Sequence, residues 1–311
     1  MPIKLVYFAT PKVALESFKA LICDENFKVT AFVTQAPKPS GRGKKIVENE
    51  LKKIADENSI KVFEPYKIAT EPEIIAELSA IEPDFFVTFA FGQILSQEIL
   101  DIPKFGTINL HASLLPEYRG ANPIRQAILD GAEKTGVTTM LTELELDSGD
   151  ICLQEEIELD IETNSIDLTN KIATISPELI KKTLIELKSG SLKPVKQNHV
   201  AATFTKKTRK EDKIINWNEN SIEIHNKIRA LVDNFICQTT YGGKIVKILK
   251  SSLCDKNGET GVVLEISKQG IIVGCQEGSV LIQTVKPEGK GEMSAHAWSL
   301  GARVKIGDKF D

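Results

Sequence analysis

The chain has 311 residues, of which 41% are hydrophobic and 26% charged, and a formal net charge of −4. This length exceeds one ordinary compact core, so two domains are predicted, and the composition is typical of a soluble globular protein. No stretch approaches the ~20 apolar residues that span a bilayer, and the apolar run at residues 3–10 is too short for an export signal, so neither class is expected.

In the first two thirds of the chain, short apolar runs alternate with helical patterns. Strands are predicted at residues 3–8, 28–33, 84–91 and 107–111, and helices at 13–22, 46–58, 71–80, 122–130 and 165–188. This alternation predicts an α/β domain with a doubly wound, mostly parallel, Rossmann-like sheet. Ligands of such sheets bind beyond the carboxyl ends of the strands, so the loops after Phe8, Phe91 and His111 are expected to carry the chemistry. No G-x-G-x-x-G follows the first strand, which disfavours a dinucleotide site.

The pattern changes near residue 189, where Ser189, Gly190, Ser191 and Pro194 end the long helix. Beyond this break come one predicted helix at 221–232 and five short strands at 235–240, 244–250, 261–266, 270–275 and 279–285. Five short strands in about fifty residues predict a small OB-like β-barrel, a fold that often holds nucleic acid. The predicted organisation is therefore a domain at 1–188, a linker at 189–206 and a second domain at 207–311.

Charge is distributed unevenly between these parts. Residues 1–204 carry 22 Lys and Arg against 30 Asp and Glu, a charge of −8, whereas residues 205–311 carry 17 against 13, a charge of +4. A basic C-terminal third indicates a polyanionic partner for that part, although plain solvation accounts for the same excess.

The five cysteines, at positions 23, 152, 237, 254 and 275, are odd in number and never spaced as C-x-x-C. This pattern disfavours both a zinc site and a disulfide framework. It is typical of small core residues in a reducing compartment, so a cytoplasmic protein without a metal is expected.

The richest stretch for chemistry is Ile108-Asn109-Leu110-His111, followed by Ala-Ser-Leu-Leu-Pro. On a strand at 107–111 the period of two places Asn109 and His111 on one face at the carboxyl end. Two polar side chains that emerge together there indicate a site. The alternative is a buried Asn and His whose polar atoms are satisfied by backbone hydrogen bonds.

A second stretch, Leu146-Asp147-Ser148-Gly149-Asp150, is by itself typical of a solvated turn. Together, however, Asn-x-His-x-Ser-Leu-Leu-Pro and Leu-Asp-Ser-Gly-Asp resemble the folate-dependent formyltransferase family. The resemblance implies that Asn109, His111 and Asp147 form the catalytic trio and that 10-formyltetrahydrofolate is the formyl donor. It also implies that two segments line the folate site: Phe91, Gly92, Ile94 and Leu95, and Ser113, Leu114, Leu115 and Pro116.

These residue types suit the transfer of a formyl group to an amine, because a tetrahedral oxyanion develops and must be stabilised by hydrogen-bond donors. The Asn109 amide and a protonated His111 are donors. Asp147 would hold His111 as an imidazolium and take the proton of the amine, directly or through water. The scheme requires no metal and no covalent intermediate.

Further segments resemble the branch of the family that formylates methionyl-tRNA. The basic Gly/Pro-rich loop after Val33 and the C-terminal domain both match that branch, which predicts methionyl initiator tRNA as the acceptor. Phosphate contacts are expected from six cations in these segments: Arg42, Lys44, Lys45, Lys206, Lys207 and Arg209. For each group of cations the alternative is a solvated surface.

Two other readings stay open. An amino-sugar nucleotide formyltransferase would use the same trio without the loop around Arg42, and an inactive RNA-binding protein would have no need of an intact trio. The family usually reads Phe-Ala-Gly-Thr-Pro after the first strand, whereas Phe8-Ala9-Thr10-Pro11 lacks that glycine. The geometry of the first loop is therefore open. A monomer that does not enter membranes is expected.

Overall fold

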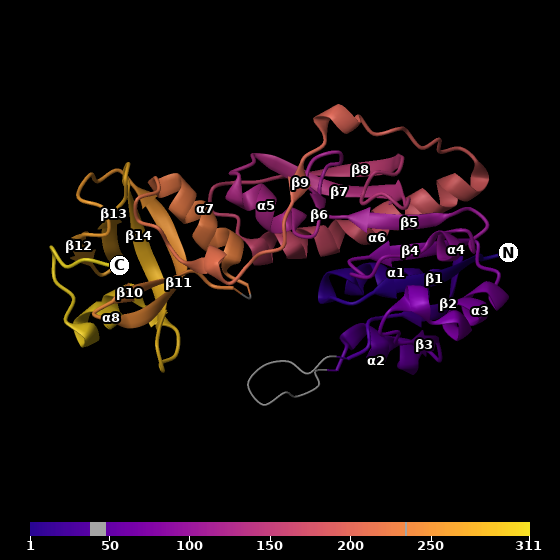
Figure 1. The fold of residues 1–311 in the computed structure, drawn as a ribbon, viewed down its shortest axis with the longest axis horizontal. Helices are drawn as coiled ribbons and strands as arrows, with labels where there is room; N and C mark the ends of the chain where they lie inside the picture. Colours follow the sequence, from indigo (N-terminus) through magenta and orange to yellow (C-terminus); the bar gives the residue numbers. More distant parts are fainter. Residues whose placement is uncertain (38–47, 234) are drawn as a thin grey trace. The chain divides into compact units, whose positions relative to one another are not determined.

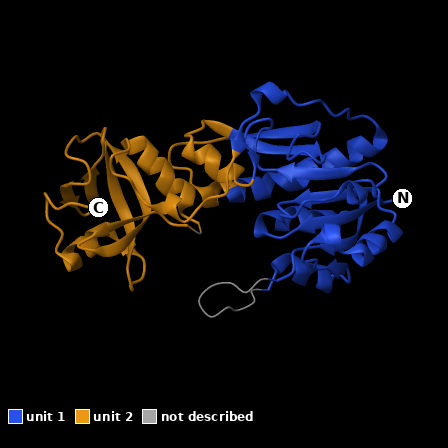
Figure 2. Cartoon of the chain, viewed as in Figure 1, with its two compact units in different colours: residues 1–120, 135–157, 169–204 blue, residues 121–134, 158–168, 205–311 orange. Residues whose placement is uncertain are grey.

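The computed structural model describes residues 1–37, 48–233 and 235–311 (Figure 1). These residues form two compact units (Figure 2). Unit 1 comprises residues 1–120, 135–157 and 169–204, and unit 2 comprises 121–134, 158–168 and 205–311. Unit 2 thus contains two segments from the first two thirds of the chain. The domain boundaries predicted at 188 and 207 stay a prediction.

Unit 1 is built on a seven-stranded sheet with the order β3-β2-β1-β4-β5-β7-β8. Its strands are β1 (Ile3–Ala9), β2 (Phe27–Val33), β3 (Lys61–Phe63), β4 (Phe85–Phe89), β5 (Thr107–His111), β7 (Lys134–Leu141) and β8 (Ile151–Glu158). The strands from β3 to β5 run parallel, and β7 is antiparallel to β5. The predicted mostly parallel α/β sheet is confirmed.

Three of these strands were not predicted from the sequence. β3 has only three residues, and β8 is largely solvated, so neither forms an apolar run. In β7 the buried positions include Thr135, Thr138 and Thr139, whose polarity hides the strand from a search for apolar periodicity. The hydroxyls of Thr138 and Thr139 are hydrogen-bonded inside the unit, which is how they are tolerated there.

Helices cover both faces of the sheet. The helical segments are η1 (Lys12–Ala14), α1 (Leu15–Cys23), α2 (Glu50–Glu57), η2 (Ile68–Thr70), α3 (Pro72–Ala80), α4 (Gln97–Leu100), α6 (Ser165–Ser189) and η3 (His199–Ala201). The helix α5 (Pro123–Leu129) and the start of α6 belong to unit 2. Local interactions explain where two of these helices begin. The Asn49 side chain accepts from the Leu51 N–H at the start of α2, and Pro72 occupies the first turn of α3.

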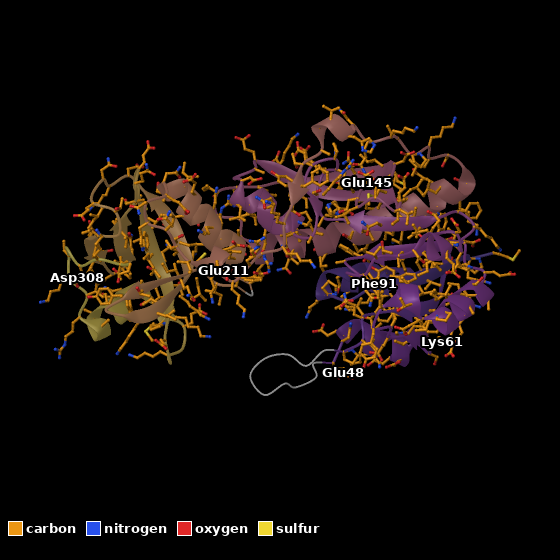
Figure 3. The ribbon with its side chains drawn as sticks, viewed as in Figure 1. Glu48, Lys61, Phe91, Glu145, Glu211 and Asp308 are labelled. Carbon is orange, nitrogen blue, oxygen red and sulfur yellow. The ribbon has the colours of Figure 1, made fainter. Side chains whose placement is uncertain are left out.

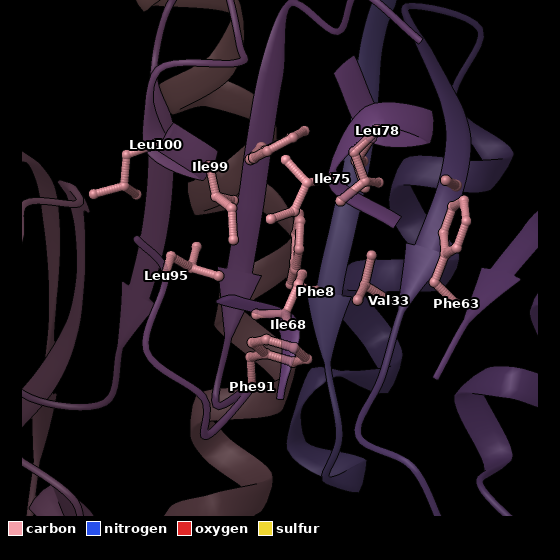
Figure 4. Packing of buried hydrophobic residues seen from close by; sticks show 13 residues of the cluster. Phe8, Val33, Phe63, Ile68, Ile75, Leu78, Phe91, Leu95, Ile99 and Leu100 are labelled. Atoms are coloured by element: carbon pink, nitrogen blue, oxygen red, sulfur yellow. The ribbon is translucent and has the colours of Figure 1, made fainter. Parts of the chain in front are cut away.

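Alternate residues of β1 face opposite cores. Phe8 belongs to the cluster in Figure 4, which joins β1, β2 and β4 to α3 and α4 through side chains such as Leu78 and Ile99. Tyr7 points the other way and stacks on Phe18 of α1, with ring centroids 5.0 Å apart. A strand buried on both faces is the expected consequence of helices on both sides of a parallel sheet.

Unit 2 contains an antiparallel sheet with the order β10-β11-β14-β13-β12. Its strands are β10 (Gln238–Tyr241), β11 (Lys244–Cys254), β12 (Val263–Ser267), β13 (Gly270–Gly274) and β14 (Ser279–Pro287), and the short β15 (Met293–Ser294) pairs with β14. Each of the five predicted strands is present. Also in this unit are η4 (Glu211–Lys213), α7 (Ser221–Leu231) and α8 (Ala295–Ala302), and α7 begins with a capping box between Asn220 and Glu223.

Residues 307–311 close this sheet into a barrel. On one side the Val263 N–H donates to the Asp308 carbonyl and the Phe310 N–H to the Gly261 carbonyl, both at 2.8 Å. On the other side the backbones of Thr240 and Asp311 exchange two hydrogen bonds of 3.2 and 3.1 Å. Because the segment bonds to both edges, neither β10 nor β12 is left as an open edge strand. The prediction of a small OB-like barrel is confirmed.

In the part of the chain that the structure describes, no helix is long and apolar enough to cross a membrane.

Candidate active site

The loops after β4 and β5 leave the same edge of the sheet, because the two strands are neighbours and parallel. β5 has the bounds predicted from the sequence, 107–111, and pairs Asn109 with Thr88 of β4. The Thr88 hydroxyl donates to Asn109 Oδ1 at 2.7 Å. Among the described residues the Asn109 Nδ2 group has no hydrogen-bond acceptor. The amide therefore presents its two N–H donors away from β4.

His111 lies roughly 7 Å further along the same face of β5, two strand residues from Asn109. Its side chain is 6% exposed, and its Nε2 lies 2.9 Å from the Tyr118 carbonyl oxygen. A carbonyl can only accept, so Nε2 carries a proton. The other ring nitrogen, Nδ1, lies 3.6 Å from Asp147 Oδ2. His111 is thus partly satisfied by the backbone, yet its Nδ1 edge is turned toward a carboxylate.

Asp147 sits in the loop between β7 and β8, with its side chain 11% exposed. One carboxylate oxygen, Oδ2, accepts the Gly120 N–H at 2.7 Å. The other, Oδ1, has no hydrogen-bond partner within residues 1–37, 48–233 and 235–311. The backbone φ of Asp147 is +51°, in the left-handed region that costs a residue with a side chain of order 1–3 kcal/mol. Such strain at a polar residue is typical of a functional site.

The segment Tyr118–Gly120 connects these two side chains. The Tyr118 carbonyl accepts from His111, and the Gly120 N–H donates to Asp147. The two atoms lie on one short stretch of backbone that includes β6 (Arg119–Gly120), which pairs with β9 (Phe204–Thr205). The structure therefore brings Asn109, His111 and Asp147 together, although Asp147 is far from the other two in the sequence.

The loop after β4 carries four residues predicted to bind folate. Phe91 and Leu95 are 4% and 7% exposed and belong to the core cluster in Figure 4, so they support the loop after β4 from the core side. Ile94 is 82% exposed. Gly92 has a φ of +77°, a backbone conformation that residues with a side chain rarely adopt, so this position favours glycine.

The loop after β5 carries the other four predicted folate residues. Ser113 and Leu115 are buried, whereas Leu114 and Pro116 are half-buried. The Thr138 hydroxyl donates to the Ser113 carbonyl at 2.7 Å, and the Gln154 amide donates to the Leu115 carbonyl at 2.9 Å. This loop is therefore held to β7 and β8 by side chains that the sequence analysis did not identify. Phe91 and Glu145, labelled in Figure 3, mark the loop after β4 and the loop that carries Asp147.

The predicted tRNA-binding cations are only partly described. Lys206, Lys207 and Arg209 are exposed, and their side chains make no ion pair with any described residue. Arg42, Lys44 and Lys45 lie outside the described residues. The three described cations belong to unit 2, whereas the predicted trio belongs to unit 1.

Besides Tyr118, three further residues hydrogen-bond to the trio and were not predicted as site residues. Thr88 orients Asn109, Gly120 holds the Asp147 carboxylate, and Gln197 donates to the Asp147 carbonyl at 2.9 Å. Gly120 follows the Asn-x-His-x-Ser-Leu-Leu-Pro motif by four residues, and a glycine so close to the motif is the one local signal among the three. Nothing local marks Thr88 or Gln197, because each lies in an ordinary strand or loop sequence. In the described ranges no three His, Cys, Asp or Glu side chains are grouped so as to hold a metal ion.

Comparison with known proteins identifies the family of this chain. Residues 4–184 match the formyl transferase family model, and residues 207–303 match that of the formyl transferase C-terminal domain. The methionyl-tRNA formyltransferase of Clostridium acetobutylicum is 39% identical over 98% of both chains. That of Clostridium botulinum is 42% identical over 92% of this chain and 93% of the relative.

A solved structure shares the fold. It is an N-formyltransferase from Helicobacter canadensis in complex with folinic acid and dTDP-3-aminofucose, with a TM-score of 0.68 and 23% identity over 90% of this chain and 99% of that one. The sequence relatives are considerably more similar than this sugar enzyme. The chain belongs to the formyl transferase family, within its methionyl-tRNA formyltransferase branch.

Proposed function

We propose that this protein transfers the formyl group of 10-formyltetrahydrofolate to the free amino group of methionyl initiator tRNA, for translation initiation. The observation that carries the proposal is the meeting of Asn109, His111 and Asp147 at one edge of the sheet, with His111 Nδ1 3.6 Å from Asp147 Oδ2. The similarity to methionyl-tRNA formyltransferases over almost the whole chain supports the acceptor.

Asp147 is the proposed proton acceptor. Its Oδ2 is occupied by the Gly120 N–H, which leaves Oδ1 for the incoming amine. As the amine nitrogen attacks the formyl carbon, the carbonyl π electrons move to oxygen and the amine proton passes to Asp147, directly or through one water. When the bond from carbon to the folate nitrogen breaks, that proton passes to the leaving nitrogen. The products are N-formylmethionyl-tRNA and tetrahydrofolate.

Asn109 and His111 are the proposed donors to the oxyanion. Thr88 holds the Asn109 carbonyl oxygen, so the two N–H groups of the amide are free for a ligand. The Nε2 proton of His111 is committed to Tyr118, which assigns the catalytic hydrogen bond to Nδ1. The 3.6 Å between Nδ1 and Asp147 Oδ2 is too long for a hydrogen bond, which leaves the Nδ1–H of a protonated His111 for the oxyanion.

The proposed folate site consists of the two loops at the same edge, with Phe91, Gly92, Ile94 and Leu95 after β4 and Ser113, Leu114, Leu115 and Pro116 after β5. Burial of Phe91 and Leu95 supports a role in shaping the site. Ile94, which is exposed, is the apolar side chain of this set that is most accessible to a pterin ring.

The proposed tRNA contacts are electrostatic. Lys206, Lys207 and Arg209 are exposed and unpaired among the described residues, which leaves their charges available to phosphates. Together with Arg42, Lys44 and Lys45 they are expected to fix the position of the acceptor end rather than to read its sequence. Arg42→Ala or Lys44→Ala should raise the KM for tRNA and reduce the salt dependence of binding.

We further propose the domain division 1–188, 189–206 and 207–311, a monomer, and a cytoplasmic location. The match of one family model to 4–184 and another to 207–303 supports this division. Size-exclusion chromatography with light scattering tests the monomer directly.

The decisive assay incubates the protein with 10-formyltetrahydrofolate and either methionyl initiator tRNA or an amino-sugar nucleotide, and follows formyl transfer. The proposal expects transfer to the tRNA alone. Asp147→Asn serves as the matched inactive variant, since asparagine tolerates the left-handed backbone and keeps an acceptor for Gly120 while losing the charge. Transfer to the sugar nucleotide alone would replace the proposal with the alternative, and no transfer to either would leave only a binding function.

A further inference from the structure

Arg119 is the largest fully buried side chain of the described residues, at 1% exposure. Its Nε and Nη2 atoms both donate to Gln197 Oε1, at 3.1 and 2.6 Å, and Nη2 also lies 3.4 Å from His199 Nδ1. The Phe204 ring centroid lies 6.0 Å from the guanidinium carbon. In the described part of the chain no carboxylate pairs with this charge. A buried guanidinium without a carboxylate partner depends on its neutral acceptors, and here the main one is a single amide oxygen.

This arrangement fixes the orientation of the Gln197 amide. Because Oε1 faces Arg119, the Nε2 group faces the other way, where it donates to the carbonyl oxygens of Asp147 at 2.9 Å and Gly149 at 2.7 Å. Gln197 itself is 5% exposed. The amide therefore holds the backbone on both sides of Ser148 with two short hydrogen bonds that no solvent replaces.

The loop that Gln197 holds is one that would not keep its shape unaided. Asp147 has a φ of +51°, and a Cβ on Gly149 would lie 1.9 Å from the Leu141 carbonyl oxygen. A residue held in a sparsely populated conformation persists only where its surroundings determine it. The two carbonyl hydrogen bonds from Gln197 provide such a determinant on the backbone, and the Gly120 N–H provides one on the carboxylate.

We propose that Arg119 and Gln197 are positioning residues for Asp147. The Arg119 charge orients the Gln197 amide, the amide clamps the Asp147 and Gly149 carbonyls, and the clamp aims the Asp147 carboxylate at His111 and the incoming amine. The Gly120 N–H, on the residue after Arg119, holds the Asp147 carboxylate directly. The inference rests on the role assigned above to Asp147.

The variant Gln197→Glu distinguishes the role of the amide oxygen, which accepts from Arg119, from that of the amide nitrogen, which donates to the loop. A glutamate keeps an oxygen acceptor for Arg119, now as a charged pair, but it has no N–H to donate to the loop. The expected result is a folded protein with a lowered melting temperature, because the charged pair with Arg119 offsets only part of the cost of leaving the Asp147 and Gly149 carbonyls without a donor. Its kcat should fall by about ten- to a hundredfold with both KM values within about twofold, because a displaced carboxylate weakens the transition state more than substrate binding. Gln97→Glu, at an exposed position of α4, is the matched control and should retain the wild-type kcat.

A double-mutant cycle with Asp147→Asn tests whether Gln197 acts through Asp147. If it does, adding Gln197→Glu to Asp147→Asn should lower the residual rate by less than about twofold. A wild-type kcat for Gln197→Glu, or an equal loss in both backgrounds, would overturn the inference. A normal rate for Asp147→Asn would instead defeat the assigned catalytic role itself, so the two failures are distinguishable.

Arg119→Lys provides a second variant should Gln197→Glu not fold. Lysine keeps the charge but cannot offer two nitrogens of a planar fork to one oxygen, so the amide loses part of its orientation. We expect a several-fold lower kcat with little change in either KM. Unchanged turnover in this variant would also contradict the positioning role.

Discussion

Both units bury an arginine whose shortest hydrogen bonds go to an amide or carbonyl oxygen, yet the two arginines hold different segments. In unit 1, Arg119 holds Gln197, which in turn holds the loop of Asp147. In unit 2, Arg229 of α7 donates to the Thr163 carbonyl at 2.7 Å, to the Ile128 carbonyl at 3.4 Å and to Asn226 Oδ1 at 3.0 Å. The same local chemistry holds the loop of the proposed catalytic Asp147 in one unit and joins segments of the fold in the other.

The residues around Arg229 make the contrast clear. His225 Nε2 lies 2.8 Å from the Ile161 carbonyl, and Asn226 donates to the Leu129 carbonyl at 3.4 Å. Neighbouring polar side chains on α7 therefore bind the segments 121–134 and 158–168, which lie far before α7 in the sequence. Neither Ile161 nor Leu129 has the positive φ that strains the backbone at Asp147. This buried network is expected to stabilise unit 2 without contributing to the reaction.

The largest effect should come from the trio of unit 1. Asn109→Ala and His111→Ala each remove a proposed donor to the oxyanion, which typically costs about 3–4 kcal/mol in the activation free energy, or a hundredfold or more in rate. Both variants should stay folded, since the sheet edge is held by other hydrogen bonds. Single-turnover formyl transfer and thermal melting measure the two quantities. Near-normal rates in both variants would contradict the proposal that Asn109 and His111 of unit 1 take part in the reaction.

The second effect concerns stability alone. Arg229→Met keeps the apolar stem but removes the donor to the Thr163 carbonyl and one of the two donors to the Ile128 carbonyl, which also accepts the Gly131 N–H. This loss should destabilise unit 2 by about 3 kcal/mol. Urea unfolding followed by Trp217 and Trp298 fluorescence reports on this unit, because both tryptophans lie in it. At a temperature well below melting, kcat should stay within about twofold of wild type. A loss of kcat comparable with that of the trio variants would contradict the comparison.

A third change should affect the rate through the backbone of unit 1. Gly149→Ala places a methyl group 1.9 Å from the Leu141 carbonyl oxygen, so the loop must move to accept it. We expect kcat to fall about tenfold, which corresponds to about 1.4 kcal/mol, as Asp147 is carried along. Gly190→Ala is a useful control on stability, since nothing lies within 4 Å of the position that its methyl group would take, while its φ of +75° imposes a backbone cost. Only the Gly149 variant should slow the reaction.

The smallest effect is a pH dependence of unit 2. Burial lowers the pKa of His225, while its hydrogen bond to the Ile161 carbonyl and the nearby charge of Glu162 oppose the shift and Arg229 reinforces it. Because the folded pKa lies below the unfolded value of about 6.5, the unfolded state binds the proton more readily. Stability of unit 2 should therefore be complete above about pH 6.5 and decline as the pH falls toward the folded pKa.

His225→Gln tests this dependence. Glutamine can donate to a carbonyl and accept from Ser251 Oγ, which lies 3.0 Å from His225 Nδ1, but it does not titrate. The acid-side slope of the unfolding free energy should become shallower in this variant. An identical slope in wild type and variant between about pH 5 and 7 would show that another group is responsible.

Sequence alone determined the features that depend on local pattern. The strand at 107–111, with Asn109 and His111 on one face, follows from a period of two residues, and the five short strands of the barrel follow from apolar runs between turns. The family resemblance added Asp147 from a motif that is ambiguous by itself. Each of these signals lies within a few consecutive residues, where backbone preference and side-chain alternation are decisive.

Only the tertiary structure decided which distant residues meet. The approach of His111 to Asp147, the clamp of Gln197 on a loop about fifty residues away, and the closing of the barrel by residues 307–311 all join segments that share no local pattern. The same holds for the segment 121–134: its helix was predicted correctly, but its place in unit 2 depends on hydrogen bonds from α7. Local sequence fixes the conformation of a segment, whereas its partner is chosen by the burial and hydrogen bonding of the whole chain, and the chemistry of this protein lies in those partnerships.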